Sequence, residues 1–227
     1  MVLEPAEPHM DGRIRDIHAA LVDEHGEPDP PRERPAVDSL IHTILSQNTT
    51  DENRDAAWDS LVAEFGHDYE AIERADHDAL AASIRTAGLA DQKATRIQDA
   101  LRTVREHTGG DYSLEFIADM DVEEAQEWLT NIRGIGDKTA GIILLFRFGK
   151  PYFPVDTHCE RLAKRFDLIP EDASYSQAHD LLTECVPDDI KYSFHRLLID
   201  HGRAYCTARN ANCDNPVCRE FCDCEYC

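Results

Sequence analysis

Apolar residues recur along this chain at the spacing of helix faces. Stripes of this kind lie within residues 14–21, 37–45 and 94–104. Apolar positions three and four residues apart bury one face of an α-helix, and no run of alternating apolar and polar residues indicates a strand. The pattern therefore predicts an all-α fold. The same periodicity predicts further helices at about residues 122–131, 137–148, 157–167, 176–185 and 190–202.

Capping residues and prolines divide the pattern into segments. Thr50, Asp121 and Asp156 each stand at the start of a predicted helix, where a side-chain oxygen can accept a backbone N–H. Prolines within residues 28–35 block helix and favour extended backbone, which predicts a linker. We expect a second boundary at residues 149–151, where glycine and proline follow a predicted helix.

Charge is spread unevenly. The net charge is −22, from 45 acidic and 23 basic residues, which taken alone argues against a polyanionic partner. Residues 129–165 and 191–209 nevertheless carry more basic than acidic side chains, so we expect a basic binding face on an acidic body. An acidic, lysine-poor surface is typical of halophile-like proteins. At molar salt the Debye length falls to about 3 Å, and binding to any phosphate-bearing partner must then rest on short-range hydrogen bonds.

The N-terminus is acidic and lacks the apolar core of a signal peptide. The longest apolar run is far shorter than a membrane span. These features predict a soluble cytoplasmic protein.

A short glycine-containing segment joins two of the predicted helices. Gly134 and Gly136 flank Ile135. Glycine permits a tight turn and lacks the Cβ that would keep a phosphate away. The first N–H groups of the following helix, together with its dipole, favour an anion. A lone Gly-x-Gly is weak evidence, because a plain corner between two helices needs no function.

Longer segments carry a resemblance to a known family. The sequences LTNIRGIGDKTAG at 129–141, PVDTHCERLAKR at 154–165 and HGRAYCTAR at 201–209 are similar to the endonuclease III family of DNA glycosylases and AP lyases, in the helix–hairpin–helix GPD superfamily. The similarity covers about residues 35–227. It implies a two-lobed helical fold acting on double-stranded DNA that contains damaged bases or abasic sites, and we expect a monomer. The expected lobes are a six-helix lobe with the hairpin at about 30–150, and a discontinuous cluster lobe of 1–29 and 151–227.

The resemblance assigns the chemistry to two residues. The family's motif lysine falls on Lys138, and the aspartate of its Val-Asp-Thr-His segment falls on Asp156. In that family the lysine attacks C1′ of the flipped nucleotide, expels the damaged base and forms a Schiff base, and elimination then nicks the strand. The aspartate assists proton movement and stabilises the oxocarbenium-like sugar. Two residues depart from the family pattern: Asp137 stands where Arg or Lys is frequent, and Arg133 where Pro is frequent.

Both catalytic candidates also have ordinary structural explanations. Lys138 can be a surface helix residue near a phosphate, and Asp156 can simply cap a helix. Neither explanation excludes the chemistry, because a capping aspartate can be held rigidly beside a reacting sugar.

An extruded base leaves a hole in the DNA stack that a side chain must fill. The sequence ILSQNTTD at 44–51 resembles the family loop with this role. A gapless match places Asn48 at the family's glutamine position, and Gln47 remains an alternative. An ordinary capped helix end explains the same segment without function. A further turn matches a family segment and places Leu89 towards the opposite DNA strand.

Cysteines crowd the segment 206–227. In the resembled family, six, two and five residues separate the successive ligands of an iron–sulfur cluster. With a two-residue insertion, the ligands of a [4Fe–4S] cluster here are Cys206, Cys213, Cys218 and Cys224. Cys222 and Cys227 remain spare, and structural zinc is the rival because a Cys-x-x-Cys pair is a zinc half-site. The resemblance favours a structural cluster that holds Arg209 against a DNA phosphate.

The sequence thus predicts a bifunctional DNA N-glycosylase and AP lyase of base excision repair that acts on oxidised pyrimidines. Two alternatives stay open. One is a glycosylase for uracil or thymine mismatches, and the other is a non-catalytic DNA-binding protein that holds zinc. Lys138 and Asp156 argue against the passive binder, which needs neither residue.

Overall fold

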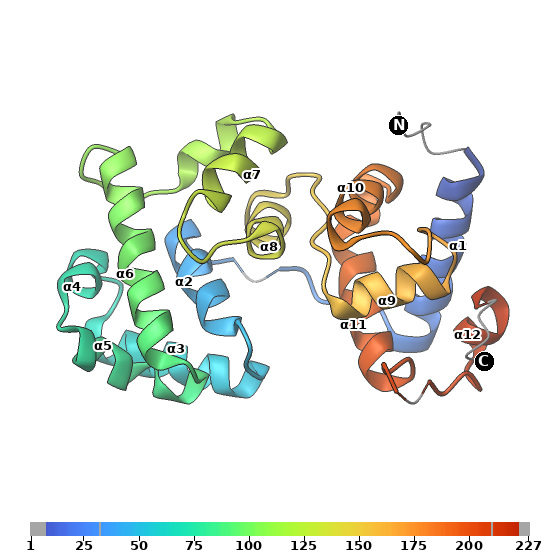
Figure 1. Cartoon of the computed structure of the whole chain (residues 1–227), viewed down its shortest axis with the longest axis horizontal. Coiled ribbons are helices and arrows are strands. Elements are labelled where there is room, and N and C mark those ends of the chain that lie inside the picture. The colour runs from blue at the N-terminus through green and yellow to red at the C-terminus, as the bar shows by residue number, and fades with distance from the viewer. Residues whose placement is uncertain (1–7, 32, 210, 223–227) are drawn as a thin grey trace. The chain divides into compact units, whose positions relative to one another are not determined.

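The structure is a computed structural model that describes residues 8–31, 33–209 and 211–222. Within these ranges the fold is helical, with twelve α-helices and three short 3-10 helices (Figure 1). The only strand-like pairing among the described residues is an isolated bridge between Cys206 and Ala211. The predicted all-α class is confirmed.

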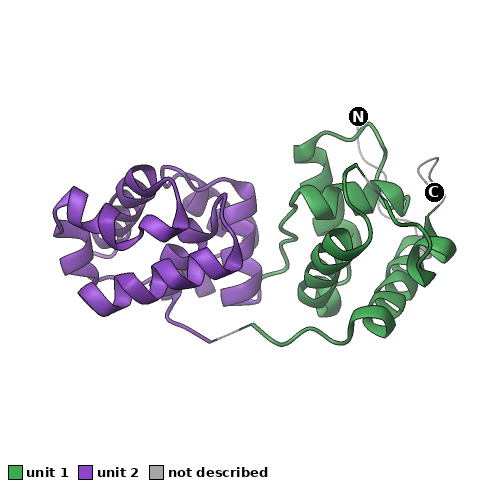
Figure 2. Cartoon of the chain, turned by 90° about the horizontal axis from the view of Figure 1, so that it is seen from below, with its two compact units in different colours: residues 1–31, 150–227 green, residues 32–149 purple. Residues whose placement is uncertain are grey.

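The chain forms two compact units, coloured separately in Figure 2. Unit 1 contains residues 1–31 and 150–227, and unit 2 contains residues 32–149. The chain passes between the units at the proline-rich segment and again after Gly149. None of the described helices has both the length and the hydropathy that crossing a bilayer requires.

Unit 2 is built around α2, which packs on α3, α6 and α8. Its apolar stripe is buried, and Leu40 and Ile44 have no exposed surface. The α-helices of unit 2 are α2 (Ala36–Ser46), α3 (Asp51–Phe65), α4 (Tyr69–Arg74), α5 (His77–Ser83), α6 (Ala90–His107), α7 (Val122–Thr130) and α8 (Asp137–Phe148). The 3-10 helices are η1 (Arg85–Ala87) and η2 (Glu115–Asp119).

The described part of unit 2 therefore has seven α-helices, one more than the six expected from sequence. Two of the seven, α4 and α5, are short helices at residues 69–83 that the apolar periodicity did not predict. Asp68 accepts the N–H of Ala71, and Asp76 caps the next helix in the same way. Because each aspartate begins a new helix, the segment never shows a long apolar stripe.

Unit 1 packs α11 between α1 and α9. Its core is aromatic as well as aliphatic: Phe153, Phe166 and Phe194 are fully buried. The elements of unit 1 are α1 (Pro8–His25), α9 (Thr157–Arg165), α10 (Tyr175–Cys185), η3 (Asp188–Ile190), α11 (Lys191–Ala204) and α12 (Pro216–Phe221).

The three predicted N-caps are confirmed. Thr50 accepts from Asn53, Asp121 accepts from Glu124, and Asp156 caps α9. α12 is not predicted by the apolar periodicity, because it has only six residues. Its asparagine cap and the proline in its first turn are nevertheless ordinary helix-start signals.

Candidate nucleic-acid interface

A left-handed glycine shapes the turn between α7 and α8. Gly134 has φ of +86°, a backbone conformation that other residues rarely adopt. The N–H of Ile135 donates to the carbonyl of Ile132 at 3.0 Å and closes the turn. Gly136 is the N-cap of α8, and no side chain caps this helix. The first N–H groups of α8 therefore keep the arrangement that binds anions at helix N-termini.

The two glycines differ in what a side chain would meet. A Cβ on Gly134 would lie 2.7 Å from Cδ and Nε of Arg96, whereas a Cβ on Gly136 meets nothing within 4 Å. We expect Gly134→Ala to lower the free energy of unfolding by about 2–3 kcal/mol. The matched Gly136→Ala variant should lose less than about 1 kcal/mol. Urea denaturation measures both, and equal losses would contradict this explanation of the turn.

Lys138 is the second residue of α8, and its side chain is exposed. Its ammonium makes no hydrogen bond or ion pair with any residue that the structure describes. The neighbouring Asp137 accepts from Nε2 of Gln126 at 2.7 Å. Lys138 is therefore an exposed amine beside an uncapped helix start, and no described residue bonds to it.

Asp156 is 8% exposed and lies in unit 1. Its Oδ1 accepts the backbone N–H groups of His158 and Cys159, both at 2.8 Å. Burial lowers the pKa of His158, so that its ring is neutral near pH 7. The structural role of Asp156 as an N-cap is confirmed, and the same bonds fix the orientation of its carboxylate.

The two candidates for filling the DNA stack lie in the turn after α2 and differ in their contacts. Nε2 of Gln47 donates to the carbonyl of Gly134 at 3.1 Å and to Oγ1 of Thr139 at 3.3 Å. Its Oε1 accepts from Nη1 of Arg96 at 2.5 Å. Asn48 is exposed and has φ of +52°. Gln47 is thus hydrogen-bonded to the hairpin, while the side chain of Asn48 is exposed to solvent.

Leu89 lies between η1 and α6 in a left-handed conformation, with φ of +50°. It is 54% exposed, an unusual position for a large apolar side chain. Such strain persists where the surrounding structure imposes it, and it is often found at functional sites. Leu89 is therefore a large apolar side chain exposed on the surface of unit 2.

The expected basic face is only partly available, because four basic side chains of residues 129–165 are held by partners within the protein. Carboxylates, a backbone carbonyl and a cysteine sulfur hold them, whereas Arg196 and Arg203 of the second basic segment are exposed. Arg133 and Lys138 remain exposed on the hairpin. Arg209 is exposed on the loop after α11. The internal partners are Glu115 for Arg147, Glu160 for Lys164, and Cys206 for Arg161 and Arg165.

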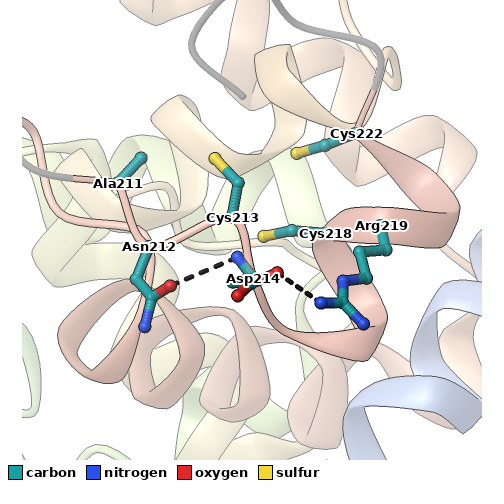
Figure 3. Close-up of a pocket in the computed structure, with 7 residues that line it drawn as sticks. All are labelled: Ala211, Asn212, Cys213, Asp214, Cys218, Arg219 and Cys222. Carbon is teal, nitrogen blue, oxygen red and sulfur yellow. Dashed lines mark hydrogen bonds and ion pairs between the residues drawn. The ribbon is translucent and has the colours of Figure 1, made fainter.

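Cysteine side chains gather around one pocket of unit 1, which has a volume of about 560 Å³. Cys213 is disulfide-bonded in this structure. Figure 3 shows the sulfur atoms of Cys213, Cys218 and Cys222 turned towards the same space. Cys206 and Cys218 are buried and contact each other through their thiols. Cys224 and Cys227 lie outside the described residues. The residues lining the pocket are Ala211, Asn212, Cys213, Asp214, Cys218, Arg219 and Cys222.

Polar neighbours surround these sulfur atoms. Nη1 of Arg165 donates to Sγ of Cys206 at 2.7 Å, and Nε2 of His201 lies 3.5 Å from Sγ of Cys218. In the described ranges, no three His, Cys, Asp or Glu side chains are close enough to hold one metal ion. The donor set is nevertheless chemically suited to iron–sulfur or zinc, because both prefer thiolates.

Comparison with known proteins places these features in a family. Residues 41–188 match the HhH-GPD superfamily of base excision DNA repair proteins. Endonuclease III of Sulfolobus acidocaldarius is 32% identical over 185 residues, covering 81% of this chain and 80% of that protein. Endonuclease III of Thermotoga maritima is 29% identical over 209 residues, covering 92% of this chain and 90% of that protein.

Solved structures with the same fold include protein–DNA complexes. One is a trapped endonuclease III–DNA covalent intermediate, with a TM-score of 0.78 and 24% identity over 94% of this chain and 95% of that one. Another is a thermostable thymine-DNA glycosylase, with a TM-score of 0.77 and 21% identity over 95% and 96% of the two chains. The chain belongs to the HhH-GPD superfamily of base excision DNA repair proteins and is an endonuclease III-like DNA glycosylase.

Proposed function

We propose that this glycosylase is bifunctional: it excises oxidised pyrimidines from duplex DNA and then nicks the strand as an AP lyase. The observation that carries this proposal is the exposed amine of Lys138 beside the uncapped start of α8. A primary amine can form a Schiff base with the sugar. The related adenine glycosylases carry serine at this position and are inefficient lyases.

Lys138 acts as the nucleophile in this scheme. Its neutral Nζ attacks C1′ of the extruded nucleotide, the N-glycosidic bond breaks, and the base leaves with a proton. Opening of the sugar ring gives the Schiff base. Loss of a proton from C2′ then expels the 3′ phosphate and cleaves the strand.

Asp156 serves the same nucleotide as Lys138. Its carboxylate, fixed by two backbone N–H groups, stabilises positive charge that develops on the sugar and assists proton movement. Lys138 belongs to unit 2 and Asp156 to unit 1. The proposal therefore requires the DNA to engage both units at once.

The glycine hairpin holds the duplex, and the two exposed turns that carry Asn48 and Leu89 open it. The first N–H groups of α8, with Gly134 and Gly136 leaving room, bind a phosphate without reading sequence. Asn48 fills the space that the extruded base leaves, and Leu89 approaches the opposite strand. Their exposure and left-handed backbones support these roles. The enzyme works as a monomer on nucleoid DNA.

A panel of duplexes, each with one lesion, tests the proposed activity. An oxidised pyrimidine should give base release, a nicked strand and a covalent adduct after borohydride reduction. Faster release from uracil or thymine mismatches would favour the alternative substrate class. Binding without release or adduct would overturn the enzymatic proposal. Repeating the panel at several salt concentrations shows whether the acidic body is matched to high salt.

We propose that the cysteines around the pocket, once all are reduced, hold a [4Fe–4S] cluster that keeps Arg209 near a DNA phosphate. The expected ligands are Cys206, Cys213, Cys218 and Cys224, with Cys222 competing for the fourth position because its sulfur faces the pocket.

Cys218→Ser should remove most of the iron and acid-labile sulfide from the purified protein. Cys185→Ser is the matched control, since this half-buried thiol of α10 does not line the pocket. Comparing iron content in Cys222→Ser and Cys224→Ser identifies the fourth ligand. A colourless wild-type protein with bound zinc would contradict the cluster.

A further inference from the structure

Two side chains one turn apart on α6 link three turns of unit 2: the turn that carries Asn48, the turn that carries Leu89, and the glycine hairpin. We propose that Lys93 and Arg96 are positioning residues that hold the Asn48 turn in register with the Leu89 turn and with the glycine hairpin. The inference rests on the proposed function, in which these turns open and grip DNA. α2 packs against both α6 and α8 in this unit (Figure 1).

Lys93 joins the first two turns. It has no exposed surface, and its Nζ donates to the carbonyls of Leu45 and Ala87, both at 2.8 Å. Leu45 lies in the last turn of α2, just before Asn48, and Ala87 ends η1, just before Leu89. Carbonyls at helix ends have no intrahelical donor. The Lys93 ammonium therefore bonds to both helix ends, one just before Asn48 and the other just before Leu89.

Fold stability alone does not explain a lysine at this position. Burial, and then the nearby Arg96 charge, lower the pKa of Lys93 to about 8. The amine remains mostly protonated at neutral pH, so folding buries a charge. An apolar side chain of similar volume often fills such a position without loss of stability. What only the lysine provides is a pair of directed hydrogen bonds.

Arg96 joins the Asn48 turn to the hairpin. It donates to Oε1 of Gln47, and the amide group of Gln47 donates in turn to the carbonyl of Gly134. The Arg96 side chain occupies the space that a Cβ on Gly134 would need. Gln47 is therefore assigned to fixing its neighbour Asn48 rather than to entering the DNA.

The test compares duplex with single-stranded substrates. Arg96→Ala, Lys93→Met and Gln47→Ala should slow nicking at a duplex lesion by about tenfold or more, because small misplacements of positioned groups reduce rates strongly. Nicking at an abasic site in single-stranded DNA should change less than about twofold, since no stack must be opened. Arg102→Ala is the control on the same helix, where an exposed ion pair with Asp99 contributes little.

A double-mutant cycle separates positioning from general damage. Asn48→Ala should slow the wild type but add little to Arg96→Ala, because interacting residues are non-additive. Additive losses, or equal losses on both substrates, would overturn the inference. If Lys93→Met does not fold, Arg96→Ala and Gln47→Ala carry the cycle, since both side chains are only half-buried.

Hydrogen exchange without DNA keeps this inference distinct from the proposed activity. The amides of residues 46–50 and 87–90 should exchange faster in Lys93→Met, and those of 46–50 and 134–139 faster in Arg96→Ala, with neither pattern in Arg102→Ala. Unchanged exchange would overturn the positioning role even in an active enzyme. A wild type that cuts neither substrate would instead overturn the proposed function, and the exchange pattern would still decide whether α6 couples the turns.

Discussion

Lys138→Ala is expected to abolish the borohydride-trapped adduct and to slow strand nicking by about three orders of magnitude or more. A Schiff base needs a primary amine, and alanine supplies none. The free energy of unfolding should change by less than about 0.5 kcal/mol, because the side chain is exposed and alanine favours helix. Trapping on a duplex with one abasic site, resolved by denaturing electrophoresis, measures the adduct.

Arg133→Ala is the matched control for Lys138→Ala. It removes one positive charge from the same hairpin, and Arg133 is likewise exposed, so it separates loss of charge from loss of the amine. DNA affinity should fall modestly, with the adduct retained. An adduct of normal yield in Lys138→Ala would show that another amine is the nucleophile.

Asp156→Asn is expected to slow nicking by about 100-fold while leaving the fold intact. Asparagine caps helices about as well as aspartate, so α9 keeps its start and only the carboxylate charge is lost. Asp156→Ala should show the same kinetic loss and, in addition, lose about 1 kcal/mol of unfolding free energy. Single-turnover kinetics and urea denaturation provide the two measurements.

Asp121→Ala controls for the loss of a helix cap. Asp121 starts α7 through the same kind of bond, to the N–H of Glu124 at 2.8 Å. The Asp121→Ala variant should lose a similar amount of unfolding free energy, but it should not show the slower nicking of Asp156→Ala. Wild-type nicking rates in Asp156→Asn would show that Asp156 only caps α9.

Local signals predicted the longer helices well, because apolar periodicity and end caps act within a few residues of chain. α8 begins and ends at the predicted residues, and α7 differs by one residue at its end. The short helices α4, α5 and α12 escaped because they contain one or two turns and no extended stripe. Their capping residues were present in the sequence but had no periodic pattern to confirm them.

The sequence by itself determined the all-α class, the main helix starts and, through resemblance, the candidate residues Lys138 and Asp156. Tertiary structure alone showed that Gln47 is bonded to the hairpin while Asn48 is exposed, because the bond from Gln47 to Gly134 joins residues 87 positions apart. It also buried Lys93 and paired Arg147 and Arg165 with partners from distant segments. A side chain's local sequence fixes its backbone preference, but its partners come from distant segments that only folding brings together.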